Sequence, residues 1–357
     1  MGGTDRQRTR SRERLERLST STLGCDSIQR EAVGELQRLI GFDRWCWPLA
    51  DPTTLLPLGG AGEHDYGPRV PRALELEYSG GDFAAKDVLA RRASSVGCLS
   101  AETGGDLARS PRWDEVMRTA GIGDIAVVPC RDALGCWGWM EAYRDRGDQP
   151  FREEDLEFLG SVGTSLGAAL RRGLGVSPPD RGDVPGPGAT GVIVLSADLQ
   201  VVSLTGGARA WAGALPLADV FASWGILPAV VYPLAARARA GGAAAQAQAL
   251  DRVADGRWVK IEAAPLQGQI EGEIAVTLRD ATASETFQRR SRIYGLSQRE
   301  RDVVAALLAG SDTRAVTTRL FISAHTVQDH LKSVFEKMSI HSRREMLAMF
   351  NASQDRR

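Results

Sequence analysis

The sequence predicts a multidomain α+β protein that ends in an all-α domain. Three observations support this fold class. The 357 residues exceed one ordinary domain, and a hydrophobic content of 43% is typical of a globular chain. Helical and strand-like patterns alternate up to about residue 284, whereas only helical periodicity follows. A Pro/Gly-rich linker, residues 175–190, separates two α+β regions.

Charge is distributed unevenly along the chain. The whole protein has a net charge of −1, but residues 289–357 carry 13 Lys or Arg and 7 Asp or Glu, so the remainder is acidic. A basic segment on an acidic body predicts a confined contact with nucleic acid. Apolar runs are too short to span a membrane, and the N-terminus lacks an apolar signal core, so we expect a cytoplasmic protein without a membrane partner.

The first region is residues 1–22, which contain six arginines and few apolar residues. This composition predicts a disordered basic tail, with a contact to DNA phosphates as the alternative.

Residues 23–174 alternate helices and strands. Helical stripes cover 28–41, 83–92, 113–119 and 151–172, and strands are expected at 44–49, 125–129 and 137–143. An antiparallel sheet flanked by helices is an α+β domain. The segments 42–47, 109–112, 136–138 and 151–156 resemble those of GAF domains, so the resemblance implies a sensor domain that binds a ligand or assembles the protein.

Residues 191–284 begin and end with paired strands. Strands are expected at 191–195, 201–204, 257–263 and 273–278, with a short helix around Trp211 and an Ala-rich helix at 235–250. A hairpin, then helices, then a closing hairpin resembles a PAS domain.

Tryptophans and cysteines are the candidate functional residues of these two regions. For Trp45, Trp47, Trp137 and Trp139, core packing is the preferred interpretation and a ligand pocket is the alternative. For Trp211, Trp224 and Trp258, core packing and a ligand pocket both stay open. The five scattered cysteines predict reduced thiols, with a redox pair of Cys130 and Cys136 as the alternative. His64 is the one histidine in residues 23–174, so we expect neither a metal nor a cofactor.

Residues 285–357 contain four short helices with clear end signals. Ser297 with Glu300, and Ser342 with Glu345, form capping boxes, and Gly310 ends the first helix. Asp312 and Ser323 begin the second and third helices. The turn Phe321-Ile322-Ser323 joins these two into a helix-turn-helix, whose second helix, residues 324–337, fits the DNA major groove. An ordinary helical bundle is the alternative.

Particular residues identify this stretch as similar to the LuxR/FixJ-type DNA-binding domain. They are Leu296, Arg299, Glu300, Gly310, Leu320, Ile322, Ser323, Thr326, Val327, His330, Lys337 and Arg343. The sequence departs from the family pattern at Ala315, where a glutamate is usual, and at Gln328, where a lysine is usual. The resemblance and the polar helix face together assign DNA contacts to Thr313, Arg314, Ser323, His325, Thr326, Gln328, Asp329, Lys332, Lys337 and Arg343.

Function follows from this C-terminal domain. We expect a transcriptional regulator that binds double-stranded DNA as a homodimer and has RNA polymerase as a possible further partner. A ligand or protein effector is expected to act on the GAF-like and PAS-like domains. The apolar patch of Met346, Met349 and Phe350 is the expected dimer interface. Since no catalytic motif is present, we expect no enzymatic activity. The alternatives are a protein-interaction scaffold with a degenerate helix-turn-helix and a redox-responsive regulator.

Overall fold

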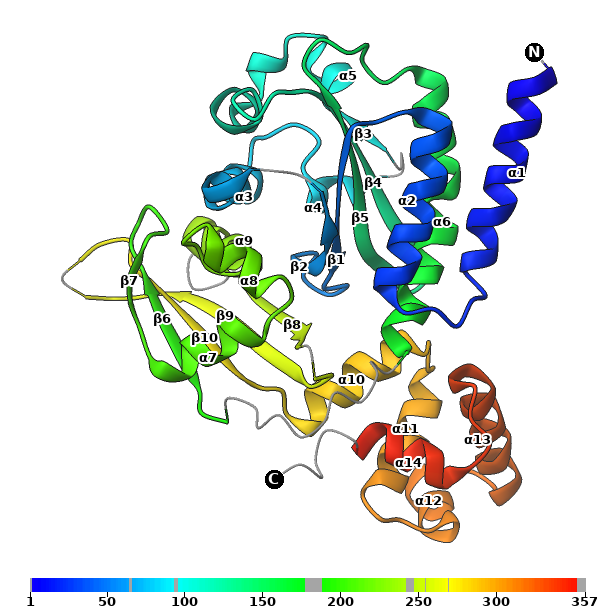
Figure 1. Cartoon of the computed structure of the whole chain (residues 1–357). Helices are drawn as coiled ribbons and strands as arrows, with labels where there is room; N and C mark the ends of the chain where they lie inside the picture. Colours follow the sequence, from blue (N-terminus) through cyan, green and yellow to red (C-terminus); the bar gives the residue numbers. More distant parts are fainter. Residues whose placement is uncertain are drawn as a thin grey trace. The chain divides into compact units, whose positions relative to one another are not determined.

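Two antiparallel sheets and a set of short helices make up the computed structural model (Figure 1). It describes residues 2–63, 66–92, 96–176, 188–241, 247–253, 255–268 and 270–351. The chain divides into two units, Met1–Asp280 and Ala281–Arg357. The first unit contains both sheets. Most of the expected linker, and His64, lie outside the described residues.

The first sheet has the strand order β2-β1-β5-β4-β3. Its strands are β1 (Arg44–Ala50), β2 (Pro57–Gly62), β3 (Gly97–Cys98), β4 (Ile122–Asp132) and β5 (Gly135–Asp145). The predicted strands at 44–49, 125–129 and 137–143 are confirmed. Nearly every residue of β4 and β5 is buried, because helices cover both faces of this sheet.

One face of this sheet carries α2 (Cys25–Ile40) and α6 (Glu153–Gly175), as Figure 1 shows. Gly167 lets α6 approach β4 closely, since a Cβ atom there would lie 2.5 Å from the backbone nitrogen of Arg131. The other face is covered by α3 (Val70–Tyr78), α4 (Lys86–Leu89) and α5 (Leu99–Thr103). The helices expected at 83–92 and 113–119 shorten to α4 and to one wide turn, Trp113–Met117.

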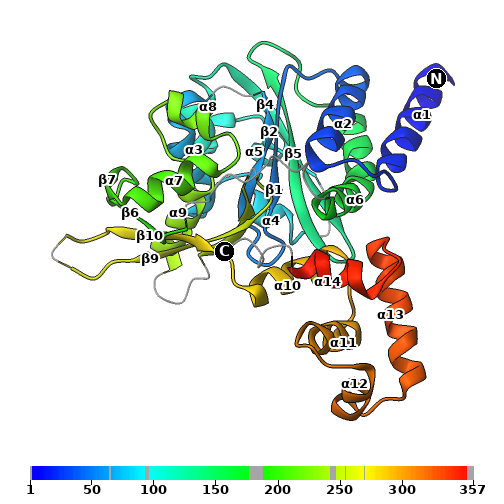
Figure 2. The same cartoon turned by 60° about the horizontal axis from the view of Figure 1, so that its bottom comes forward.

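The N-terminal segment is a helix, α1 (Gly2–Leu18), and the prediction of a disordered tail is wrong. Leu15 and Leu18 are buried where α1 packs beside α2 and α6 (Figure 2). The hydroxyl of Ser11 donates to Glu35 of α2 at 2.5 Å, and Arg8 lies 3.5 Å from Asp155 of α6. The helix is therefore ordered by contacts distant in sequence, which its polar composition does not reveal.

The second sheet has the order β7-β6-β10-β9-β8, the same topology as the first. Its strands are β6 (Gly191–Leu195), β7 (Val201–Leu204), β8 (Gln248–Arg252), β9 (Trp258–Pro265) and β10 (Ile274–Asp280). Its core is closed by α7 (Gly206–Ala214) and α9 (Val231–Gly241), with α8 (Ala218–Ser223) between them in sequence. The helix expected at 235–250 is confirmed up to Gly241 and is wrong at residues 248–250, because Gln248–Arg252 pairs with β9 as a strand.

The two α+β regions are joined by buried apolar side chains and by several polar contacts. Leu56, Leu58 and Tyr78 from the first region belong to the core cluster of the second. Asp51 accepts a hydrogen bond from the backbone nitrogen of Leu250 at 3.1 Å, and Arg237 donates to Asp87 at 2.9 Å. These contacts explain why residues up to Asp280 form one unit despite the linker.

The second unit consists of α10 (Ala283–Ile293), α11 (Gln298–Leu308), α12 (Thr313–Leu320), α13 (Ala324–Met338) and α14 (Arg343–Asn351). The four predicted helices are present, and α10 joins them through Phe287, whose ring centroid lies 5.3 Å from that of Phe350. Val303, Val304, Leu307, Val316, Val327, Leu331 and Val334 form the core.

Candidate DNA-binding surface

The turn between α12 and α13 sets the geometry of a helix-turn-helix. Phe321 ends α12 in the left-handed conformation at φ 55°, and its side chain is 93% exposed. Ser323 begins α13, because its hydroxyl accepts a hydrogen bond from the backbone nitrogen of Thr326 at 3.0 Å. Thr326 also contacts this hydroxyl at 2.9 Å. Ser323 and Thr326 therefore shape the start of the helix as well as lying at the expected DNA face.

Helix α13 presents one buried face and one exposed face, as its sequence predicts. Val327, Leu331, Val334 and Met338 are buried. His325, Gln328, Asp329 and Lys332 are exposed, and the side chains of His325 and Asp329 retain 87% and 64% exposure. The imidazole of His325 lies 3.6 Å from the carboxylate of Asp329, one turn away. This face offers amide, carboxylate, imidazole and ammonium groups to a partner, the group types that contact base edges and phosphates.

Lys337 has a different environment from Lys332. Its ammonium lies 2.6 Å from one carboxylate oxygen of Glu300 on α11 and 2.8 Å from the other. Ser333 donates to the same carboxylate at 2.6 Å. Glu300 is buried, so this lysine neutralises an internal charge, while its own side chain is 35% exposed. Lys337 therefore has a structural partner, and its contact with DNA stays a prediction.

Hydrogen bonds explain the low pKa of Glu300. Burial by itself would raise the pKa, but hydrogen bonds from Lys337, Ser333 and the backbone of Ser297 outweigh it and lower the pKa to about 2. The same carboxylate completes the predicted capping box of α11, since it accepts from the Ser297 nitrogen at 2.6 Å. Glu300 therefore ties the start of α11 to the end of α13.

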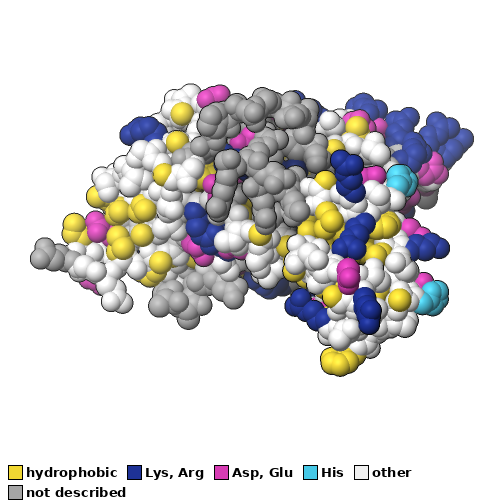
Figure 3. Space-filling view, turned by 90° about the horizontal axis from the view of Figure 1, so that it is seen from below, with side chains coloured by type: hydrophobic (Ala, Val, Ile, Leu, Met, Phe, Trp, Pro, Cys, Tyr) yellow, Lys and Arg dark blue, Asp and Glu magenta, His cyan; other side chains and the backbone are white. Residues whose placement is uncertain are grey.

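The remaining expected contact residues lie near the start of α12 and α14. Thr313 is half-buried at the first turn of α12, and Arg314 beside it is exposed. Arg343 donates to the backbone oxygen of Ser311 at 2.9 Å, so it links α14 to the α11–α12 loop. Figure 3 shows Lys and Arg side chains spread over the exposed surface of this unit.

The expected dimer patch is largely internal. Met346 and Phe350 are buried in the core of the unit, and Met349 is half-buried against it. Their spacing on one helical face reflects packing within the domain. Met346 and Phe350 are therefore not available to a second copy, and the assignment of these two side chains to a dimer interface is corrected.

The candidate residues of the first unit are also mostly internal. Trp45, Trp47, Trp137, Trp139, Trp211 and Trp258 are buried. Cys130 and Cys136 are buried free thiols. Burial raises the pKa of both, that of Cys136 to about 11, which disfavours the reactive thiolate. These six tryptophans thus follow the core-packing interpretation, whereas Trp224 is half-buried and lines a cavity.

A helix-turn-helix with an exposed polar second helix is the arrangement found in many DNA-binding domains. Comparison with protein families gives the particular class: residues 295–350 match the bacterial regulatory proteins of the luxR family, and residues 25–170 match the GAF domain. No curated protein matches the chain. The matches therefore identify a luxR-family DNA-binding domain at residues 295–350 and a GAF domain at residues 25–170. No helix within the described residues is long and apolar enough to cross a membrane.

Proposed function

We propose that this protein regulates transcription by placing α13 of two identical chains in successive major grooves of a DNA operator. The observation that carries the proposal is the exposed polar face of α13, in which His325, Gln328, Asp329 and Lys332 point away from the domain core. A helix of 15 residues is about 22 Å long, which suits the groove and leaves a few side chains in reach of base edges.

Base reading is assigned to Gln328 and Asp329. Gln328 offers a donor and an acceptor, which match the N6 and N7 atoms of adenine. Asp329 offers acceptors only, so it favours a donor such as cytosine N4. Lys332 and Arg314 are exposed cations that suit phosphates. One helix therefore specifies few base pairs, and two half-sites are needed for a specific operator.

The first unit supplies the regulatory input in this proposal. The GAF domain and the PAS-like region of residues 191–284 receive a ligand or a protein effector, act in the cytoplasm without catalysis, and alter contact with DNA or RNA polymerase. The PAS-like assignment is supported by the strand order of the second sheet, which repeats that of the GAF domain. Since Met346 and Phe350 are buried, pairing of two copies is assigned to other surfaces.

The test is binding of the full chain to genomic DNA fragments, followed by gel shifts of the enriched sequence against salt. Specific binding with a steep salt slope and a two-fold symmetric site is expected. Binding that ignores sequence, or none at all, would favour the alternative of a protein-interaction scaffold. Sedimentation of the protein–operator complex measures the number of chains bound.

A further inference from the structure

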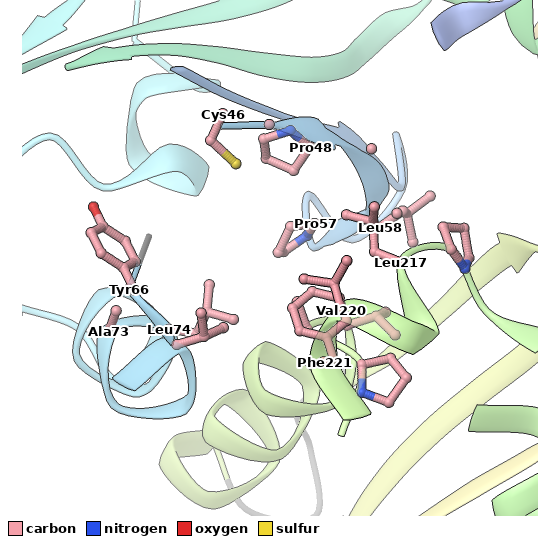
Figure 4. Close-up of a pocket in the computed structure, with 18 of the residues that line it drawn as sticks. Cys46, Pro48, Pro57, Leu58, Tyr66, Ala73, Leu74, Leu217, Val220 and Phe221 are labelled. Atoms are coloured by element: carbon pink, nitrogen blue, oxygen red, sulfur yellow. The ribbon is translucent and has the colours of Figure 1, made fainter. Parts of the chain in front are cut away.

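A cavity of about 210 Å³ lies within the first unit, between the first sheet and the segment that follows α7 (Figure 4). The GAF domain contributes β1, β2 and α3, through Cys46, Pro48, Leu58 and Leu74 among others. A dry apolar cavity of about 150 Å³ holds a benzene ring, so this volume suits a small aromatic or branched aliphatic molecule. Apolar side chains form most of the wall.

The second wall comes from the PAS-like region. Leu217, Val220 and Phe221, which belong to α8 or precede it, line the cavity opposite β2. Gly59 of β2 allows this approach, because a Cβ atom there would lie 2.5 Å from Cγ of Pro216. The backbone nitrogen of Gly59 donates a hydrogen bond to the carboxylate of Asp251 on β8 at 3.1 Å. The cavity is thus complete only when the two regions are joined. Leu217 and Val220 are 45% and 41% exposed, which places the opening beside α8.

One end of the cavity is charged. Lys86 contacts Glu77 at 2.7 Å and also pairs with Glu141. Arg112 contacts Glu77 at 2.9 Å and Asp82 at 2.7 Å. These five side chains are almost fully buried, and Glu77, Lys86, Arg112 and Glu141 reach the cavity wall.

This cluster contains three carboxylates and two cations, so it leaves one negative charge within it. Burial of an unbalanced charge is costly, and a bound cation offsets that cost. Aromatic side chains of Tyr66, Phe221 and Trp224 also line the cavity. Aromatic faces attract organic ammonium groups. The charge and the rings therefore favour the same class of ligand.

We propose that this cavity binds a small apolar amine in its ammonium form, held between the GAF domain and α8. The ammonium group approaches Glu141 and Glu77, and the apolar part fills the space under Leu217 and Val220. This inference rests on the proposed function, since it names the effector class and the place where binding changes the contact between the two regions.

The experiment compares three probes of equal size on the full chain without DNA: 2-phenylethylamine, 2-phenylethanol and phenylacetate. Calorimetry at neutral pH is expected to give the amine an affinity about tenfold above the alcohol, with the carboxylate weakest. Equal affinities, strongest binding of the carboxylate, or no binding of the amine at millimolar concentration would overturn the proposal.

Two variants locate the site. Glu141→Gln removes the surplus charge and is expected to abolish the preference for the amine over the alcohol, while the alcohol still binds if the fold is kept. Val220→Arg blocks the opening from an exposed position and is expected to lower amine affinity at least about tenfold. Val202→Arg on β7, at a site 54% exposed and outside the cavity lining, is the matched control. Unchanged amine affinity in Val220→Arg would contradict the site.

Gel shifts separate this inference from the proposed function. Specific DNA binding without amine binding would overturn the cavity assignment and leave the regulator intact. Amine binding by a chain that does not bind operator DNA specifically would support the cavity assignment and overturn the proposed regulatory function.

Discussion

The first unit places a group of charged side chains in its interior, whereas the DNA-binding unit keeps most charges of α13 in solvent. Arg112, Lys86 and Glu77 are each less than 5% exposed, and both cations contact Glu77. His325 and Asp329 on α13 are mostly exposed. This difference shows that a charged residue can be assigned a function only when the burial and the partners of its side chain are known. In the second unit the buried carboxylate of Glu300 is paired with Lys337, whose side chain is 35% exposed.

The largest expected effect is at Arg112. Arg112→Ala leaves Glu77 and Asp82 without this partner in the interior, and breaking such a buried pair costs about 3–5 kcal/mol of stability. Arg118→Ala is the control, because its pair with Asp114 is about half exposed and should change stability by less than about 1 kcal/mol. Denaturant unfolding of both variants measures the loss in the free energy of unfolding. Similar losses would mean that burial does not distinguish the two pairs.

The next effect is an acid transition of the DNA-binding unit. Glu300 has a pKa of about 2 in the folded chain and 4.5 as its ordinary value. A lowered folded pKa gives stability that is fully present above pH 4.5 and is lost as the pH falls towards 2, by about 2–3 kcal/mol. Hydrogen exchange of peptides from α11 and α13 should show this loss. Glu300→Gln should reduce protection at pH 6 and flatten the dependence; an unchanged profile would contradict the role of this carboxylate.

Lys332 and Lys337 form a matched pair on one helix. Lys332→Ala should lower DNA affinity and reduce the log–log salt slope by about one, because one phosphate contact is lost. Lys337→Ala should retain the salt slope and lower thermal stability, since its ammonium contacts Glu300. Gel shifts at several salt concentrations and thermal melts measure both. A lower slope in Lys337→Ala would show that this lysine does reach DNA.

The smallest effect is expected at Asp329. Asp329→Ala removes a negative charge from the DNA face, so non-specific binding should stay the same or rise. Preference at one base pair per half-site should relax by about 1–3 kcal/mol. If Asp329 acts only within α13, through its contact with His325 one turn earlier, the variant loses stability and keeps its preference. Selection of sites from random DNA with both proteins decides, and identical preferred sequences would exclude base reading.

Sequence reasoning succeeded where structure is set by neighbours in the chain. Ser297 and Glu300, Asp312, and Ser323 cap the helices they were predicted to cap. It failed for α1, whose polar surface is ordered by Glu35 and Asp155, and for residues 248–250, which the Ala-rich pattern places in a helix but which pair with β9 as a strand.

The sequence by itself determined strands β1, β4 and β5 of the GAF domain and the helix-turn-helix, because helix caps, periodic apolar residues and turn residues act over a few positions. It did not indicate β2 and β3. The tertiary structure decided which charges are internal and where a cavity forms. Glu77, Arg112 and Glu141 meet from separate elements, and Val220 faces β2 from another region. Such meetings depend on how elements pack, since burial and charge pairing are properties of the assembled unit.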